Sequence, residues 1–213
     1  MSSSSTPSES IKQSGSDDNG SHKEAMQAVQ KEMRDKVKAA NDKRGVLIYL
    51  FGNGKGKSSS AFGTLMRAVG HGQQTAVVQF IKGNWKTGEE VYFKQETLIK
   101  HDAMKSGFTW DTQDKNADKL MAQETWAQAE KHLSDPALNL VVIDELTYMF
   151  DYDYLSLTEC LKAIQSRPAH QSVIITGRSR IEPIVEIADT VSEVVEHKHA
   201  FNEGVKAQPG IEF

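Results

Sequence analysis

The sequence has little that would tie the protein to an oxidising compartment, a membrane or nucleic acid. Its one cysteine, Cys160, cannot form a disulfide within the chain, which fits a reducing cytoplasm. No apolar run approaches the roughly eighteen residues of a membrane span, and the N-terminus lacks the apolar core of a secretion signal. The formal net charge is −4, so we expect neither nucleic acid nor an anionic membrane as a partner.

The length and composition indicate one globular body. The chain has 213 residues, of which 38% are hydrophobic and 25% charged, so it can bury a full core. Residues 1–20 are rich in serine and almost free of apolar side chains, so we expect a disordered tail there. We expect the folded domain to span residues 44–213.

Residues 21–43 show a helical pattern. Apolar side chains recur every three or four positions between charged ones, at Met26, Val29, Met33 and Val37. This spacing predicts an amphipathic N-terminal helix with a thin apolar stripe. The stripe could dock on the folded domain, on a second subunit or over a bound ligand.

The rest of the chain alternates short apolar runs with helical segments. The expected strands are Val46–Phe51, Thr75–Ile81, Leu140–Ile143, Ser172–Thr176 and Thr190–Glu196. The expected helices are Ser58–Val69, Ala117–Leu133, Leu157–Ser166 and Ile181–Ala188. Repeated β-α units predict an α/β fold, a parallel sheet with helices on both faces. Ligands of such sheets bind beyond the carboxyl ends of the strands.

A glycine-rich loop follows the first expected strand. It consists of Gly52, Asn53, Gly54, Lys55, Gly56, Lys57 and Ser58, and a helical segment comes next. Glycines let several backbone N–H groups turn toward an anion. Lys57 brings a positive charge to phosphate oxygens, and the Ser58 hydroxyl can bind the Mg²⁺ that accompanies a nucleoside triphosphate. This context predicts a phosphate-binding loop.

The loop is one residue tighter than the standard form. The standard spacing places four residues between the first glycine and Gly-Lys. Here Phe51 occupies that first position, because only three residues separate Gly52 from Gly56. A different loop shape could present a different part of the nucleotide to chemistry.

Two acids end the apolar run at residues 140–143. Asp144 and Glu145 follow this strand directly, which places a carboxylate beside the phosphate loop. Such a carboxylate can hold the metal ion directly or through water. We expect metal binding by Asp144 or Glu145.

Other polar loops carry weaker signals. Arg178 follows a strand and either reaches a phosphate or carboxylate or is an ordinary exposed charge. Trp85, Phe108 and Trp110 lie in polar loops that contain glycine, where they form either a ligand surface or loop anchors. No nucleophile is paired with a base, so a substrate of this enzyme would supply the nucleophile.

These segments resemble the P-loop type of ATP:corrinoid adenosyltransferase. The similarity covers about Arg44 to Phe213, and the short phosphate loop is itself typical of that family. Further matching segments are Arg67–Gly72, Val78–Gly83, Gly107–Trp110, Asp144–Tyr148, Thr176–Arg178 and Lys198–Phe201. The family often has threonine at the positions of Ser58 and Ser59, and both substitutions keep a hydroxyl.

The resemblance implies a RecA-like P-loop domain, usually as a homodimer. It implies that Co(I) of a corrinoid attacks the 5′ carbon of ATP and that triphosphate leaves whole. The implied acceptors are cob(I)alamin, cobinamide or cobyrinic acid a,c-diamide, with Mg²⁺ or Mn²⁺ as the divalent ion. A flavin-type reductase is the implied electron donor.

The resemblance also implies roles for individual residues. Lys57, Phe108 and Trp110 are implied to be catalytic, the two aromatics by displacing the lower axial ligand of Co(II). The implied metal ligands are Ser58, Asp144 and Glu145. The implied ATP-binding residues are Gly52, Asn53, Gly54, Lys55, Gly56, Lys57, Ser58, Ser59, Arg67, Lys82, Trp85 and Arg178. The N-terminal helix is implied to cover the corrinoid.

Two other functions are compatible with the same motifs. An ATPase or phosphotransferase that acts at the γ-phosphate would use the same loop and acid. A non-catalytic module gated by nucleotide would bind a partner protein and show no turnover. Product analysis separates them, because γ-transfer yields ADP and attack at the 5′ carbon yields triphosphate.

Overall fold

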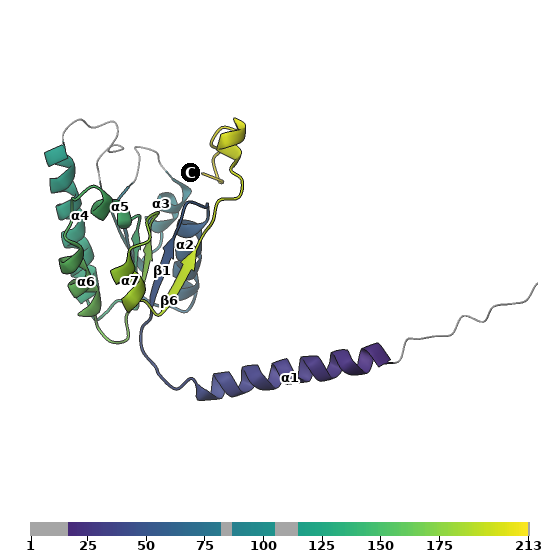
Figure 1. Cartoon of the computed structure of the whole chain (residues 1–213). Helices are drawn as coiled ribbons and strands as arrows, with labels where there is room; N and C mark the ends of the chain where they lie inside the picture. The colour runs from purple at the N-terminus through teal and green to yellow at the C-terminus, as the bar shows by residue number, and fades with distance from the viewer. Residues whose placement is uncertain (1–16, 82–86, 105–114, 213) are drawn as a thin grey trace, which may run out of the picture. The chain divides into compact units, whose positions relative to one another are not determined.

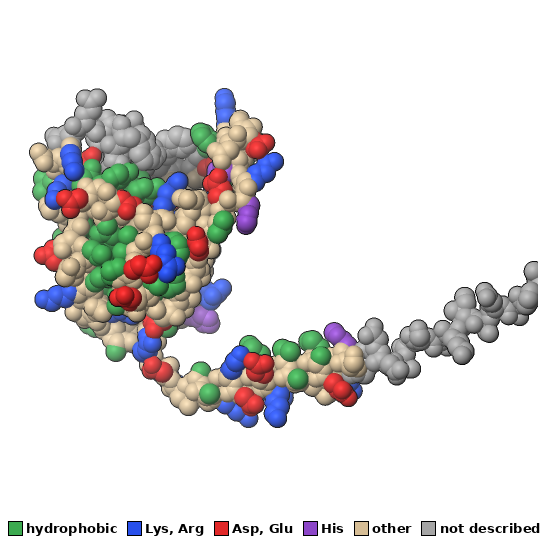
Figure 2. Space-filling model, viewed as in Figure 1, with side chains coloured by type: hydrophobic (Ala, Val, Ile, Leu, Met, Phe, Trp, Pro, Cys, Tyr) green, Lys and Arg blue, Asp and Glu red, His purple; other side chains and the backbone are tan. Residues whose placement is uncertain are grey.

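The computed structural model describes residues 17–81, 87–104 and 115–212 (Figure 1). Contacts between residues divide the chain into two units, Met1–Lys43 and Arg44–Phe213. The first unit contains helix α1, Asp17–Ala39, which begins at Asp17 rather than at the expected Ser21. Hydrophobic side chains gather along one side of α1 (Figure 2), as the spacing predicts. A single helix cannot bury such a stripe against itself.

The second unit is built on a six-stranded sheet in which every pairing is parallel. The strand order is β3-β2-β4-β5-β1-β6. The strands are β1 Leu47–Phe51, β2 Thr75–Gln79, β3 Ile99–Ala103, β4 Leu140–Asp144, β5 Ser172–Thr176 and β6 Thr190–Glu193. Strand β5 therefore lies between β1, which precedes the glycine-rich loop, and β4, which ends in the acids.

Helices cover both faces of the sheet, which confirms the expected α/β fold (Figure 1). One face packs on α2 (Lys57–Gly70) and α3 (Gly88–Phe93) through a cluster around Phe62, Leu65 and Phe93. The other face packs on the remaining helices of this unit. These are α4 (Lys115–Ser134), α5 (Thr147–Asp151), α6 (Leu157–Gln165) and α7 (Glu182–Ile187).

Strand residues alternate between the two cores. Leu47, Tyr49 and Phe51 of β1 belong to the α4 side, whereas Leu50 belongs to the α2 side. This alternation is the period of two that a strand imposes. The apolar run of β4 is buried at every position, as expected for a strand covered on both faces.

Four elements lack a sequence signal. Strand β3 has the sequence IKHDA at one edge of the sheet and only its first residue is buried, so no apolar run marks it. Helices α3 and α5 have six and five residues, too few to show a helical period. The fourth such element is a 3-10 helix of four residues at Ala200–Glu203.

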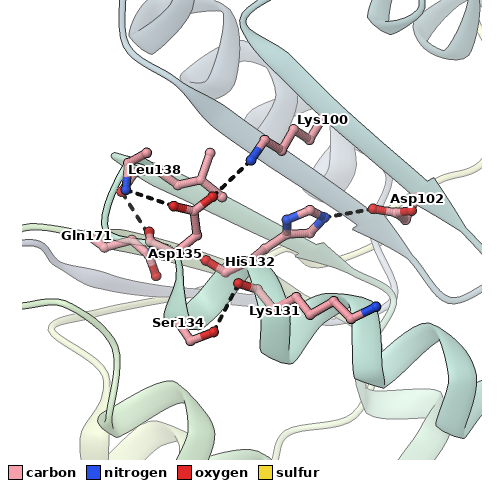
Figure 3. Close-up of polar contacts among 9 residues, drawn as sticks. Lys100, Asp102, Lys131, His132, Ser134, Asp135, Leu138 and Gln171 are labelled. Carbon is pink, nitrogen blue, oxygen red and sulfur yellow. Dashed lines mark hydrogen bonds and ion pairs between the residues drawn. The ribbon is translucent and has the colours of Figure 1, made fainter.

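The amino ends of the strands meet at the edge opposite the glycine-rich loop, and polar side chains connect them (Figure 3). The Gln171 amide donates to the carbonyls of His132 at 3.0 Å and Asp135 at 3.1 Å. Lys100 pairs with Asp135 at 2.9 Å. The Arg44 guanidinium pairs with Asp189 at 2.5 and 2.9 Å. This edge is held together by side chains from five separate segments, at Arg44, Lys100, Asp135, Gln171 and Asp189.

Candidate nucleotide-binding site

The glycine-rich loop connects β1 to α2 and is crossed by the chain that leaves β6. The Gly54 N–H donates to the carbonyl of Val194 at 2.7 Å, and the Gly52 N–H donates to that of Arg178 at 3.0 Å. Gly52 has φ +111°, and a Cβ there would lie 2.5 Å from the Val194 oxygen. A Cβ at Gly54 would lie 2.7 Å from the Val195 oxygen. Glycine is therefore required where the loop passes this segment.

The loop ends at the N-terminus of α2, which is open to an anion. Gly56 occupies the N-cap with φ +119°, no side chain caps the helix, and its first turn contains no acid. The first N–H groups of a helix have no partner inside it, and the helix dipole favours negative charge there. This combination of free amides and positive potential is what a phosphate group needs.

Lys57 is the first residue of α2, and its ammonium is nearly buried. The side chain is 7% exposed, and Nζ donates to the Gly54 carbonyl at 2.9 Å. Burial lowers the pKa of Lys57, Glu145 opposes that shift, and Arg178 adds to it. The ammonium thus lies among the groups expected to meet a triphosphate.

Asp144 ends β4 beside the loop and is held by the neighbouring strands. Thr176 Oγ1 donates to Asp144 Oδ1 at 2.6 Å, and Gln79 Nε2 donates to Oδ2 at 3.2 Å. Burial raises the pKa of Asp144, and hydrogen bonds from Thr176, Ser58 and Gln79 oppose the rise. No motif of the sequence predicted these roles of Thr176 and Gln79. They could have been found, because β2 and β5 both end in a polar residue next to β4.

Glu145 is held in a left-handed backbone conformation with φ +58°. Its N–H donates to Thr176 Oγ1 at 3.0 Å, and its Oε2 is buried without a hydrogen-bond partner among the described residues. The pKa of Glu145 is raised to about 7, first by burial and then by the neighbouring Asp144, while Lys57 and Arg178 oppose the rise. A strained backbone and a buried carboxylate oxygen without a hydrogen bond are typical of ligand-binding sites.

The oxygen donors fit a magnesium-type ion. The Ser58 hydroxyl lies within hydrogen-bond reach of Asp144, and Glu145 adds its unsatisfied oxygen. Mg²⁺ is bound through one or two carboxylates, substrate phosphates and several waters. Across residues 17–81, 87–104 and 115–212, no three His, Cys, Asp or Glu side chains gather into a metal cluster. A site of this kind depends on the phosphates to complete it.

Arg178 lies on the loop that follows β5. Its side chain is exposed and close enough to Lys57, Glu145 and Tyr148 to shift the pKa of each. Its N–H donates to Thr147 Oγ1 at 3.0 Å. The structure therefore brings Arg178 to the same edge as Lys57 and the two acids.

The exposed part of the loop meets the C-terminal segment. Asn53, Lys55 and Ser59 are exposed, and the Lys55 ammonium forms an ion pair with the carboxylate of Glu212. The sequence gives no signal for this contact, because Glu212 lies more than 150 positions from the loop. A triphosphate that reaches Lys55 has to compete with Glu212.

The structure does not bring Arg67 to the loop. Arg67 lies in the last turn of α2, where it lines a cavity of about 200 Å³ together with residues such as Val46 and Leu140. These lining residues lie at the amino ends of strands. Ten residues of helix separate Lys57 from Arg67, so Arg67 lies roughly 15 Å along α2 from the loop. The position of Arg67 gives no support to a contact with ATP, and its nucleotide-binding role stays a prediction. Lys82, Trp85, Phe108 and Trp110 lie outside the described residues.

Comparison with known proteins identifies the family of the chain. The family model "ATP:corrinoid adenosyltransferase BtuR/CobO/CobP" matches residues 43–213. A corrinoid adenosyltransferase of Escherichia coli is 47% identical over 192 residues, which cover 90% of this chain and 97% of the relative. Those of Salmonella typhimurium and Pseudomonas aeruginosa are 48% and 47% identical, over 89% and 90% of this chain and 98% and 95% of each relative. The resemblance seen in the motifs is thereby confirmed, and the chain belongs to the ATP:corrinoid adenosyltransferase family.

Proposed function

We propose that this corrinoid adenosyltransferase transfers the 5′-deoxyadenosyl group of ATP to Co(I) of a corrinoid and releases triphosphate whole. The observation that carries the proposal is the edge where the nearly buried Lys57 and the uncapped start of α2 face Asp144 and Glu145. The tightened loop supports attack at the 5′ carbon rather than at the γ-phosphate. Cob(I)alamin, cobinamide and cobyrinic acid a,c-diamide are the proposed acceptors, in the biosynthesis or salvage of adenosylcobalamin.

The protein's task in this reaction is alignment and charge stabilisation. Co(I) is a strong nucleophile, so no side chain has to act as a base. Holding cobalt near C5′ replaces an encounter in solution by a reaction within one complex. Negative charge grows on the departing triphosphate, and Lys57, Lys55, Arg178 and the first amides of α2 supply fixed positive charge there. Mg²⁺ or Mn²⁺, held by Ser58 and by Asp144 or Glu145, would supply Lewis-acid neutralisation of the same charge.

The corrinoid side of the site is proposed from the sequence. Phe108 and Trp110 would displace the lower ligand of Co(II), and Lys82 and Trp85 would contact the nucleotide. The apolar stripe of α1 would cover the corrinoid, and residues 44–213 would form the catalytic domain of a homodimer. A flavin-type reductase in the cytoplasm would deliver the electron that produces Co(I). In the described part of the chain, no helix is both long enough and apolar enough to cross a bilayer.

One experiment tests the reaction and its leaving group. ATP, hydroxocobalamin and a strong reductant are incubated with the protein, and phosphorus NMR is recorded alongside the visible spectrum of the corrinoid. We expect inorganic triphosphate and a light-sensitive adenosylcorrinoid to appear in equal amounts. Stoichiometric ADP would identify a γ-phosphotransferase instead, and ATP-dependent binding of a protein without turnover would identify a nucleotide-gated module.

A second experiment tests the phosphate site. Lys57→Ala removes a charge-assisted contact worth about 1.5–3 kcal/mol, so adenosyl transfer should fall at least tenfold. Lys131→Ala is the matched control, because Lys131 is an exposed lysine whose ammonium donates to Gln128 Oε1, one turn away on α4, at 3.2 Å. Turnover of Lys57→Ala close to that of Lys131→Ala at low ATP would contradict the assignment.

A further inference from the structure

Thr147 is a buried residue that contacts three successive residues, 177–179, of the loop that follows β5. Its side chain is 0% exposed at the start of α5, two residues after Glu145. Thr147 Oγ1 accepts the N–H of Arg178 at 3.0 Å and the N–H of Ser179 at 3.4 Å. A Cβ at Gly177 would lie 2.2 Å from the same oxygen. The hydroxyl therefore fits against the backbone of residues 177–179.

The same loop is also held by Tyr49 and is joined to the phosphate loop. The Tyr49 hydroxyl donates to the carbonyl of Ser179 and accepts the N–H of Ile181 at 3.3 Å. The Arg178 carbonyl accepts the Gly52 N–H at 3.0 Å. The position of the Arg178 backbone is thus coupled to the first glycine of the phosphate loop.

Thr147 also connects this loop to the two acids. The Glu145 N–H donates to Thr176 Oγ1 at 3.0 Å, and the Leu146 N–H donates to the Thr176 carbonyl at 3.0 Å. The turn after β4 therefore donates to the end of β5, and the loop after β5 donates back to Thr147. Two turns held by reciprocal hydrogen bonds keep a fixed spacing. The Thr147 hydroxyl therefore fixes the position of the Arg178 backbone, from which the arginine side chain extends.

We propose that Thr147 is a positioning residue that aims Arg178 at the triphosphate. This inference rests on the proposed function of Arg178 as a phosphate contact. An arginine stabilises a phosphate only when its planar fork is correctly oriented, so a backbone displacement at Arg178 weakens the contact although the side chain is unchanged. The Thr147 hydroxyl oxygen holds this backbone in place, because it accepts hydrogen bonds from the N–H groups of Arg178 and Ser179.

The test compares Thr147→Val, which keeps the shape and removes the acceptor, with Thr147→Ser, which keeps the acceptor. Binding of magnesium tripolyphosphate to the full chain is measured by calorimetry, alongside kcat and KM for ATP in adenosyl transfer. We expect Thr147→Val to weaken tripolyphosphate binding about five- to tenfold, and Thr147→Ser to stay within about twofold of the wild type. We expect Thr147→Val to have no further effect when Arg178 is already Ala.

Equal binding by Thr147→Val and the wild type would overturn the inference. It would also be overturned if the double variant Thr147→Val/Arg178→Ala lost as much affinity as the two single variants together. Equal losses in Thr147→Val and Thr147→Ser would show a packing role instead. Thr147→Ala, which also lacks the acceptor, replaces the valine variant if that variant fails to fold. The calorimetry does not require turnover, so a protein that makes no adenosylcorrinoid would contradict the proposed function while the binding data still decide the role of Thr147.

Discussion

The two edges of the sheet use charged and polar groups in opposite ways. At the amino edge, Lys100 pairs with Asp135, Arg44 pairs with Asp189, and the Gln171 amide donates to backbone carbonyls (Figure 3). At the carboxyl edge, the ammonium of Lys57 donates to a backbone carbonyl, and Glu145 keeps a buried oxygen without a hydrogen bond in the described structure. Charged groups at the amino edge are therefore paired with each other, and the buried oxygen without a described partner there, Gln171 Oε1, is a neutral amide. At the carboxyl edge the unpaired oxygen belongs to a carboxylate, which a cation can bind.

This difference separates the stability of the fold from its function. Paired groups lower the free energy of the folded state, whereas a buried and unsatisfied carboxylate raises it. Variants at the amino edge should therefore lose stability and keep nucleotide affinity. Variants at the carboxyl edge should change affinity or activity and can gain stability.

The largest change in stability is expected at Gln171. The side chain is 0% exposed and its amide donates to carbonyls at the end of α4, so Gln171→Ala removes these hydrogen bonds and opens a cavity. We expect the free energy of unfolding to fall by about 2–4 kcal/mol, measured with urea. Gln123→Ala on the exposed side of α4 is the control. A tenfold loss of ATP affinity in folded Gln171→Ala would break the separation of the two edges.

The opposite sign is expected at Glu145. Its pKa is raised to about 7, so the folded state binds more protons than the unfolded state between about pH 4.5 and pH 7. The free energy of unfolding of the nucleotide-free protein therefore falls as the pH rises through that window. Glu145→Gln removes the buried charge and should be more stable than the wild type by about 1–3 kcal/mol at pH 8, with little difference at pH 4.5. Urea unfolding in EDTA measures this, and a less stable variant at pH 8 would contradict it.

A smaller loss is expected at Asp189. Its carboxylate accepts the Arg44 guanidinium and the Leu47 N–H at 2.8 Å, which lowers its pKa to about 2. This stabilisation is complete above the unfolded pKa near 4 and disappears as the pH falls toward 2. Asp189→Asn should cost about 1–2 kcal/mol at pH 7, allowing for solvent screening, and almost nothing near pH 2. Thermal unfolding between pH 2 and pH 7 follows the difference, and a constant cost would show that charge is not its source.

The smallest effect is expected at Glu212. The ion pair with Lys55 is partly exposed, so it contributes little to stability, but it occupies a lysine of the phosphate loop. Glu212→Gln should tighten magnesium tripolyphosphate binding about two- to fivefold, measured by calorimetry. Glu203→Gln is the control, because Glu203 pairs with Lys198 at 3.7 Å in the same segment. Weaker binding by Glu212→Gln would show that the C-terminal segment assists the ligand.

The sequence predicts the carboxyl edge well because parallel strands bring their ends together. Lys57, Asp144 and Arg178 each follow an apolar run, and a parallel sheet places all three side by side. Contacts that depend on loop shape give no such signal, which is why Thr147 and Glu212 have none. Strand β3 is also silent, because a polar edge strand has no apolar period. The segment that contains Arg67 matches the family, but such a match does not indicate which end of α2 lies near the ligand.

The strand order has a consequence for the synthesis of the chain. The phosphate loop leaves β1, whose partner β5 lies 126 positions later, as in the pair Leu47 and Val173. At about 5–20 residues per second, a ribosome needs roughly 6–25 s to cover that distance. Through this interval the chain has made its most glycine-rich turn but neither strand that flanks β1. The sheet around the phosphate loop is therefore completed only late in synthesis, and a chain interrupted before β5 lacks both neighbours of β1 and is a candidate for proteolysis.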